Sequence, residues 1–95
     1  MTILNGDSRV RQRDAHVSAP MGDELAMMDL ETGKYLVLDR IGAAIWEQLE
    51  AEIRVGDLID GLQARFEVDR RQCEADVLIF LDKLRSRGLL HVSNA

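Results

Sequence analysis

The sequence has few of the residues on which catalytic sites and disulfide-bonded folds depend. Its single cysteine, Cys73, cannot form an intramolecular disulfide, so nothing in the chain points to an oxidising compartment. The two histidines, His16 and His91, fall in different expected elements and have no partner at a metal-ligand spacing. A phosphate-binding glycine loop and a paired nucleophile and base are also missing. These absences predict a protein without catalytic residues, without a metal site and without a cofactor.

Long apolar runs and an excess of positive charge are missing as well. No apolar stretch approaches the roughly 20 residues that span a bilayer, and the amino terminus does not resemble a signal peptide. We therefore expect a cytoplasmic protein with no membrane partner. The 12 Lys and Arg residues against 17 Asp and Glu give a formal net charge of −5. Because a general nucleic-acid binder neutralises phosphates with basic residues, this balance argues against nucleic acid as a partner.

The residues that are present predict one small globular domain. A chain of 95 residues, of which 46% are hydrophobic, is long enough for a single core. Residues 1–9 are expected to form a flexible polar tail, and the folded domain is expected over residues 10–92. The short segment 10–13 is too charged for a confident assignment.

A β-hairpin and the strand that follows it form the clearest local pattern. Gly33 can adopt the positive φ that closes a short turn, and residues 34–38 then carry an aromatic, a β-branched residue and two leucines. Strands over residues 15–19 and 24–30 complete a three-stranded antiparallel meander. Pro20 indicates that the first of these strands is an edge strand or ends there.

Within the third strand, alternation divides the side chains between two faces. If Leu36 and Leu38 point toward the core, Tyr35 and Val37 lie on the opposite face. That face is either covered by another element or lines a groove.

Three helices are expected after the sheet. Asp39 is a good N-cap for a helix over residues 40–50, and a second helix is expected over residues 55–66. The third begins after Asp69, which with Gln72 resembles a capping box, and ends at a glycine C-cap, Gly88. One apolar stripe runs along it, formed by Cys73, Val77, Phe80, Leu81 and Leu84. The pattern predicts an α+β fold, winged helix-turn-helix-like, with a three-stranded antiparallel sheet followed by three helices.

Other residues have both a structural and a functional interpretation. Cys73 is best explained as a small hydrophobe on the third helix, although the neighbouring Arg70 and Arg71 weakly favour a reactive thiol. Trp46 is expected in the core, with its indole N–H near an edge. The best case for DNA binding is a set of basic residues on the last two helices, but acidic residues are interleaved with them: Arg65, Arg70, Arg71, Lys83, Arg85 and Arg87.

Two stretches of the chain resemble a known family. The run from Asp29 to Asp39, followed by Gly42-Ala-Ala-Ile45-Trp46, is similar to the PqqD-like domains, which are also called RiPP precursor recognition elements. The helix from Ala75 to Leu81 and the residues Gly88 to Leu90 resemble the closing part of the same pattern. The resemblance covers almost the whole chain, roughly residues 10–92.

The resemblance implies a non-catalytic adaptor that binds the leader segment of a ribosomally synthesised precursor peptide. In this family the leader adds as a strand beside the third strand and lies against the third helix. Asp76 and Lys83, beside the apolar stripe, are equally well explained as readers of polar leader positions or as ordinary solvated residues. The expected leader-binding residues are Lys34, Tyr35, Leu36, Val37, Leu38, Asp76, Val77, Phe80, Lys83 and Leu84.

The pathway and the partner enzymes are also implied only by resemblance. Stand-alone proteins of this size resemble the recognition proteins of lasso-peptide biosynthesis, which present the precursor to a leader peptidase and a cyclase. They also resemble PqqD proper, but residues 30–33 replace its Pro-Glu-Gly type of turn, which favours the lasso type. The alternatives are a winged-helix DNA-binding regulator and a small subunit that only stabilises a larger enzyme.

Overall fold

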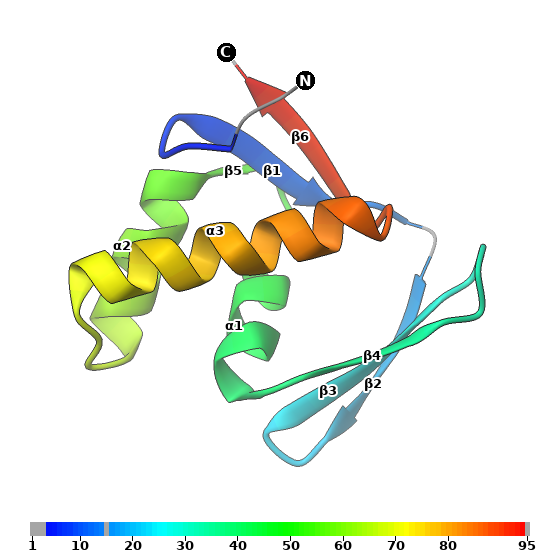
Figure 1. The fold of residues 1–95 in the computed structure, drawn as a ribbon. Coiled ribbons are helices and arrows are strands. Elements are labelled where there is room, and N and C mark those ends of the chain that lie inside the picture. The colour runs from blue at the N-terminus through cyan, green and yellow to red at the C-terminus, as the bar shows by residue number, and fades with distance from the viewer. Residues whose placement is uncertain (1–3, 15, 95) are drawn as a thin grey trace.

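The computed structural model describes residues 4–14 and 16–94, which form two antiparallel sheets and three helices (Figure 1). The elements in chain order are β1 (Ser8–Gln12), β2 (His16–Met21), β3 (Glu24–Asp29), β4 (Tyr35–Leu38), α1 (Arg40–Gln48), β5 (Ile53–Arg54), α2 (Val55–Arg65), α3 (Arg70–Ser86) and β6 (Leu90–Asn94). The α+β class expected from the sequence is confirmed. None of the helices in the described part is long and apolar enough to cross a membrane.

The expected meander is the sheet β2–β3–β4. Gly33, at φ 71°, lies in the turn between β3 and β4 as predicted. The Asp29 N–H donates to the Lys34 carbonyl at 2.9 Å, which sets the bonding pattern of the β3–β4 ladder. Because hydrogen-bonded pairs alternate along an antiparallel ladder, the Leu36 and Leu38 backbones bond to β3. The backbone groups of the intervening residues therefore point away from β3.

The same alternation explains how a proline fits into β2. The backbones of Met28, Ala26 and Glu24 in β3 bond to β2 and not to β4. The pair formed by Pro20 and Leu25 is therefore a non-hydrogen-bonded one. The Pro20 nitrogen lies at the outer edge of the sheet, where it interrupts no ladder bond. The prediction that Pro20 marks an edge strand is confirmed.

A second sheet, β5–β1–β6, was not predicted from the sequence. Its central strand includes Ser8 and Arg9, which had been assigned to the flexible tail, and Ser8 and Val10 are completely buried. The strand was missed because Arg9 and Arg11 make the segment look like a solvated tail. In the structure, the exposed Arg9 and Arg11 point to the outer face of the strand and alternate with the buried Ser8 and Val10. Strand pairing extends from Ser8 to Asn94, beyond both expected domain boundaries.

The three helices lie close to the expected positions, with α1 ending at Gln48. Asp39 caps α1, accepting a bond from the Gly42 N–H at 2.7 Å. Asp69 caps α3 through the Gln72 N–H at 3.1 Å, but the Gln72 side chain donates to Asp76, so the reciprocal half of a capping box is not formed. At the other end the Leu89 N–H bonds to the Leu84 carbonyl and Gly88 has φ 72°, a Schellman motif.

The core lies between the two sheets and the helices. Trp46 is 3% exposed, as expected, and the His16 ring packs against it in a T-shaped arrangement with the ring centroids 4.9 Å apart. Along α3, the stripe residues Cys73, Val77, Leu81 and Leu84 are buried. Phe80 belongs to the same stripe but is only partly buried, because it lies on the side of α3 that faces β4.

Candidate functional site

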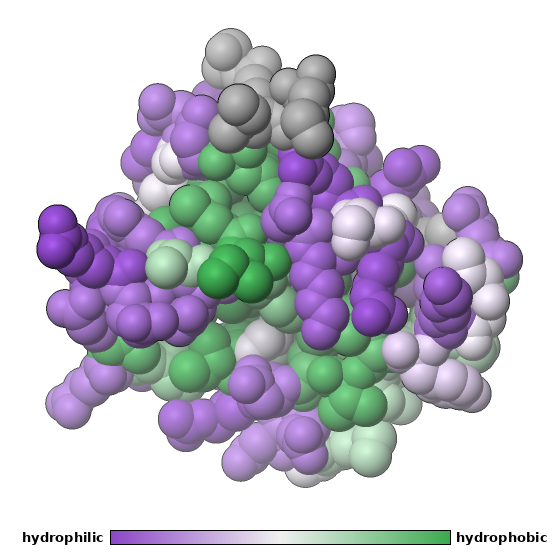
Figure 2. Space-filling model, in the orientation of Figure 1, coloured by the Kyte–Doolittle hydropathy of each residue, from purple (hydrophilic) through white to green (hydrophobic). Residues whose placement is uncertain are grey.

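A cleft separates the edge strand β4 from helix α3. Its cavity volume is about 360 Å³. In the region below α3, Figure 2 shows patches of apolar surface that polar residues interrupt. The sheet and α1 supply Val37, Leu38, Asp39, Ile41, Gly42 and Ile45, and the rest of the lining comes from α2, α3 and the segment between them: Leu62, Phe66, Val68, Gln72, Cys73, Asp76, Val77, Phe80 and Lys83. We call this cleft the groove.

A glycine allows the groove to have a closely packed floor. A Cβ atom on Gly42 would lie 3.3 Å from the Leu38 Cβ and 3.5 Å from Cε1 of Phe80. The missing side chain therefore lets β4, α1 and α3 approach one another here. Ile45 and Val77 are almost completely buried beneath the opening, so the floor is apolar.

The edge of β4 offers unpaired backbone groups beside the groove. By the ladder alternation, the N–H and C=O groups of Tyr35 and Val37 point away from β3, and β4 pairs with no other strand among the described residues. The opposite edge of the sheet is different, because β2 carries Pro20 there. β4 is therefore the edge that can accept another strand.

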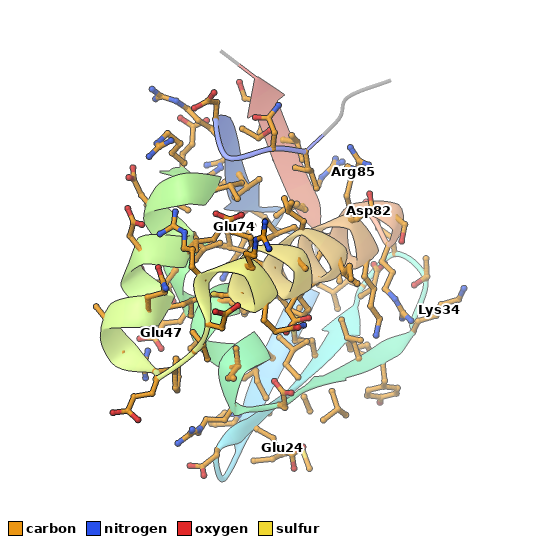
Figure 3. All side chains as sticks on the ribbon, turned by 60° about the vertical axis from the view of Figure 1, so that its left-hand side comes forward. Glu24, Lys34, Glu47, Glu74, Asp82 and Arg85 are labelled. Carbon is orange, nitrogen blue, oxygen red and sulfur yellow. The ribbon has the colours of Figure 1, made fainter. Side chains whose placement is uncertain are left out.

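A second, smaller cavity lies at the hairpin end of β4. Its volume is about 220 Å³, and it has a buried apolar floor of Met27, Leu36 and Leu89. Its rim is polar and is formed by Asp29, Thr32, Lys34, Ser86 and Arg87. Lys34 projects from the β3–β4 hairpin in Figure 3, and α3 contributes the rim residues from its C-terminal end. We call this cavity the hairpin compartment.

The carboxylate in this compartment is held by the turn. The Glu31 N–H donates to Asp29 Oδ1 at 2.9 Å, and this bond is the main cause that lowers the pKa of Asp29. Bonds from Thr32 and the charge of Lys34 act in the same direction, while burial opposes them. Asp29 therefore remains ionised and serves the turn.

The structure divides the expected binding residues into three groups. Val37, Leu38, Asp76, Val77, Phe80 and Lys83 line the groove. Lys34 and Leu36 line the hairpin compartment.

Two of the expected residues line neither cavity. Leu84 is completely buried, because its position on α3 turns it into the core, so it offers no surface to a ligand. Tyr35 is 72% exposed and its side chain lies on the outer face of the sheet. Its backbone, however, belongs to the free edge.

Sequence reasoning missed the side of the groove that α1, α2 and the following segment build. Ile41 is 38% exposed, and Phe66 and Val68 are partly buried. Ile41 and Phe66 each fall at helical spacing with neighbouring apolar residues, and this spacing indicated an apolar stripe. It did not indicate that the end of the stripe would remain uncovered.

The lone cysteine lies in the groove wall. Cys73 is 7% exposed, and burial is the main cause that raises the pKa of its thiol. A raised pKa reduces the thiolate fraction at neutral pH, and the thiolate is the reactive form. The interpretation of Cys73 as a small hydrophobe therefore fits the structure better than a reactive role.

Several of the basic residues considered for DNA binding are already neutralised by carboxylates. Arg70 bonds to Asp60 and Glu74, Arg65 lies 4.0 Å from Glu47, and Arg85 bonds to Asp82. A surface of paired charges attracts phosphates weakly. In residues 4–14 and 16–94, no group of three or more His, Cys, Asp or Glu side chains is arranged to hold a metal ion.

Comparison with known proteins defines the class to which this fold and groove belong. The model of the family described as coenzyme PQQ synthesis protein D (PqqD) matches residues 24–90. This match spans most of the chain, which therefore belongs to the PqqD family. A search of curated proteins gives no match.

Two solved structures are similar to the chain over most of its length. The first, TbiB1 in complex with the TbiA(beta) leader peptide, is 38% identical with a TM-score of 0.77, covering 85% of this chain and 94% of that chain. The second, lasso peptide synthetase B1 complexed with the leader peptide, is 23% identical with a TM-score of 0.69, covering 86% and 96%. The second supports the fold alone, while the first is a relative at the sequence level.

Proposed function

We propose that this protein binds the leader segment of a ribosomally synthesised precursor peptide as an extra strand beside β4. The observation that carries this proposal is the free edge of β4 next to an apolar groove against α3. The 38% identical relative was solved in complex with a leader peptide, which supports the same ligand class here. Within this class the proteins of lasso-peptide biosynthesis are the best fit.

Strand addition explains how such a site works. The backbone groups of Tyr35 and Val37 give affinity with little sequence information, and the groove gives specificity by accepting alternate leader side chains. The groove residues that would make these contacts are Val37, Leu38, Asp76, Val77, Phe80 and Lys83. Because a disordered leader loses chain entropy when it docks, we expect modest affinity.

The direct test is a calorimetric titration of the protein with a synthetic copy of the TbiA(beta) leader peptide, the ligand of its 38% identical relative. We expect one peptide per chain, with amide chemical-shift changes concentrated at residues 34–38 and 76–84. A scrambled peptide of the same composition is the control. Shift changes at Arg65, Arg70 and Arg71 instead of β4 would contradict the proposal. Binding of duplex DNA with a steep salt dependence would favour the DNA-binding regulator instead.

The proposed role is that of an adaptor without catalysis, which presents the bound leader to a leader peptidase and a cyclase. A surface suited to such an enzyme is the outer face of the β2–β3–β4 sheet. Cross-strand pairing places these apolar side chains on it: Val17, Ala19, Met21, Ala26, Met28, Tyr35 and Val37. Val17 and Met21 are 48% and 55% exposed, although a solvated sheet face is normally polar. Val37 also lines the groove, so a leader strand would continue this face.

We expect Val17→Glu to abolish leader removal by the pathway's peptidase while leaving leader affinity unchanged. Val17 lies on the edge strand β2, away from the groove, and burying an unpaired charge in an apolar interface is unfavourable. The measurements are the rate of leader cleavage with purified peptidase and the calorimetric affinity for the leader. Ala64→Glu, on the exposed surface of α2, is the matched control. Equal cleavage rates for the two variants would assign the peptidase to another surface.

A further inference from the structure

β4 and α3, which face each other across the groove, both have acidic residues toward one end and basic residues toward the other. On α3, the residues that face β4 are Asp76, Phe80, Lys83 and Arg87, at successive spacings that keep them on one helix face. The wall therefore changes from acidic to basic toward the C-terminal end of α3. On the other wall, β4 is preceded by Lys34 and followed by Asp39.

The lengths of the two walls match. Asp76 and Arg87 are separated by about 16 Å along the helix axis, since each residue rises about 1.5 Å. Lys34 and Asp39 are separated by about 17 Å of extended chain, at about 3.3 Å per residue. Asp39 lines the same cavity as Asp76, and Lys34 lines the same cavity as Arg87. The groove, where Asp39 and Asp76 outnumber Lys83, is therefore the acidic end of the space between β4 and α3. The hairpin compartment, where Lys34 and Arg87 outnumber Asp29, is its basic end.

The basic end has the features of a site for a carboxylate side chain. Within the part of the chain that the structure describes, neither Lys34 nor Arg87 forms an ion pair, whereas Arg54, Arg70 and Arg85 do. The Ser86 hydroxyl donates to the Lys83 carbonyl and the Thr32 side chain bonds to Asp29, so the donors that the rim can offer a carboxylate above the apolar floor are Lys34 and Arg87. The other charged group, the ionised Asp29, accepts a hydrogen bond from its own turn, and the two cations outnumber it, so the net charge of the rim is positive.

We infer that the hairpin compartment binds a glutamate or aspartate side chain of the leader between Lys34 and Arg87, and that this contact fixes the direction and register of the bound strand. The inference rests on the proposed function. A short apolar stem with a terminal carboxylate matches an apolar floor with a cationic rim, and glutamate fits this description best. Arg87 can bind a carboxylate through two parallel N–H donors, and Lys34 adds a second charge from the opposite wall.

A register signal is needed because backbone bonds alone do not supply one. A strand added to β4 forms similar bonds after a shift of two residues, or when its direction is reversed. Moving the peptide by two residues carries its acidic side chain out of the compartment. Reversing it brings that side chain toward Asp39, Asp76 and Lys83, a set of side chains whose net charge is negative and which therefore disfavours a carboxylate.

The test is a charge-swap experiment with the leader peptide used in the titration above. Each acidic residue of the leader is replaced in turn by lysine. We expect one replacement to weaken binding to the unmodified protein by about tenfold, and the same peptide to recover that loss on the Lys34→Glu/Arg87→Glu variant. The control is Arg9→Glu/Arg71→Glu, which changes the net charge equally at exposed residues outside both cavities and should restore nothing.

The outcomes separate this inference from the function on which it rests. If the unmodified protein binds no leader, the proposed function fails and the inference fails with it. If the leader binds but no lysine replacement is rescued by the double variant, the leader-binding function stands and the carboxylate site is wrong. Because Arg87 is the C-cap of α3, circular dichroism must show that the variants fold. Lys34→Glu alone, in the exposed hairpin, gives the same test at smaller amplitude.

Discussion

Replacing Val37 with proline is expected to weaken leader binding by roughly thirtyfold or more, an effect of about 2 kcal/mol. Proline removes the N–H that Val37 directs toward the free edge and places its ring where the leader backbone would lie. The leader carbonyl that this N–H would satisfy is then left without a partner. Val37→Ala keeps the backbone donor and removes only side-chain contact, so its loss should be several times smaller.

The structure indicates that the sheet tolerates this substitution. The Val37 N–H takes no part in the β3–β4 ladder, and Pro20 already occupies an equivalent outward position on β2. Leu36→Pro is the contrasting variant, because it removes a ladder bond and should unfold the sheet. Calorimetry measures the affinity and circular dichroism checks the fold. Equal losses for Val37→Pro and Val37→Ala would show that the edge of β4 is not where the leader binds.

The second large effect is expected at Phe80, which faces β4 from the helix. Phe80→Ala should weaken leader binding by roughly thirtyfold, since truncation of an interface aromatic commonly costs about 2 kcal/mol or more. Truncation of a fully buried phenylalanine lowers the free energy of unfolding by roughly 3–5 kcal/mol. Phe80 is only partly buried in the free protein, so the loss for Phe80→Ala should be smaller. Thermal unfolding and calorimetry of the same sample separate the two effects.

Two further variants make the Phe80 result interpretable. Phe80→Leu keeps most of the volume and should weaken binding with little change in thermal midpoint. Ile79→Ala removes the neighbouring side chain, which is 68% exposed and does not line the groove, and should leave the affinity unchanged. A loss at Ile79 as large as that at Phe80 would place the peptide on a different face of α3.

The features that could be predicted from sequence are those with a strong local cause. Asp39 and Asp69 cap the helices that were expected to follow them, and the apolar stripe of α3 is buried where its period placed it. Pro20 was correctly assigned to an edge strand. In each case the signal lies within a few residues and reflects backbone bonding or one periodic face.

The features that could not be predicted depend on long-range pairing. The two-residue strand β5 exists only because β1 lies beside it, and β6 pairs with a strand at the other end of the chain. The hairpin compartment likewise joins Lys34 with Arg87, and neither residue has a sequence pattern that points to the other. Periodicity identified the side chains of one wall, but only the tertiary fold sets the distance to the opposite wall.

The unequal edges of the β2–β3–β4 sheet bear on stoichiometry. A sheet with two complete edges can grow in both directions, which permits two ligands per molecule or open-ended stacking of molecules. Here β2 lacks one donor at Pro20, and β4 is bordered by the groove. Growth is therefore limited to one strand on one side. The expected ratio of one peptide to one chain is therefore favoured by a single proline, which lies on the strand opposite the proposed binding edge.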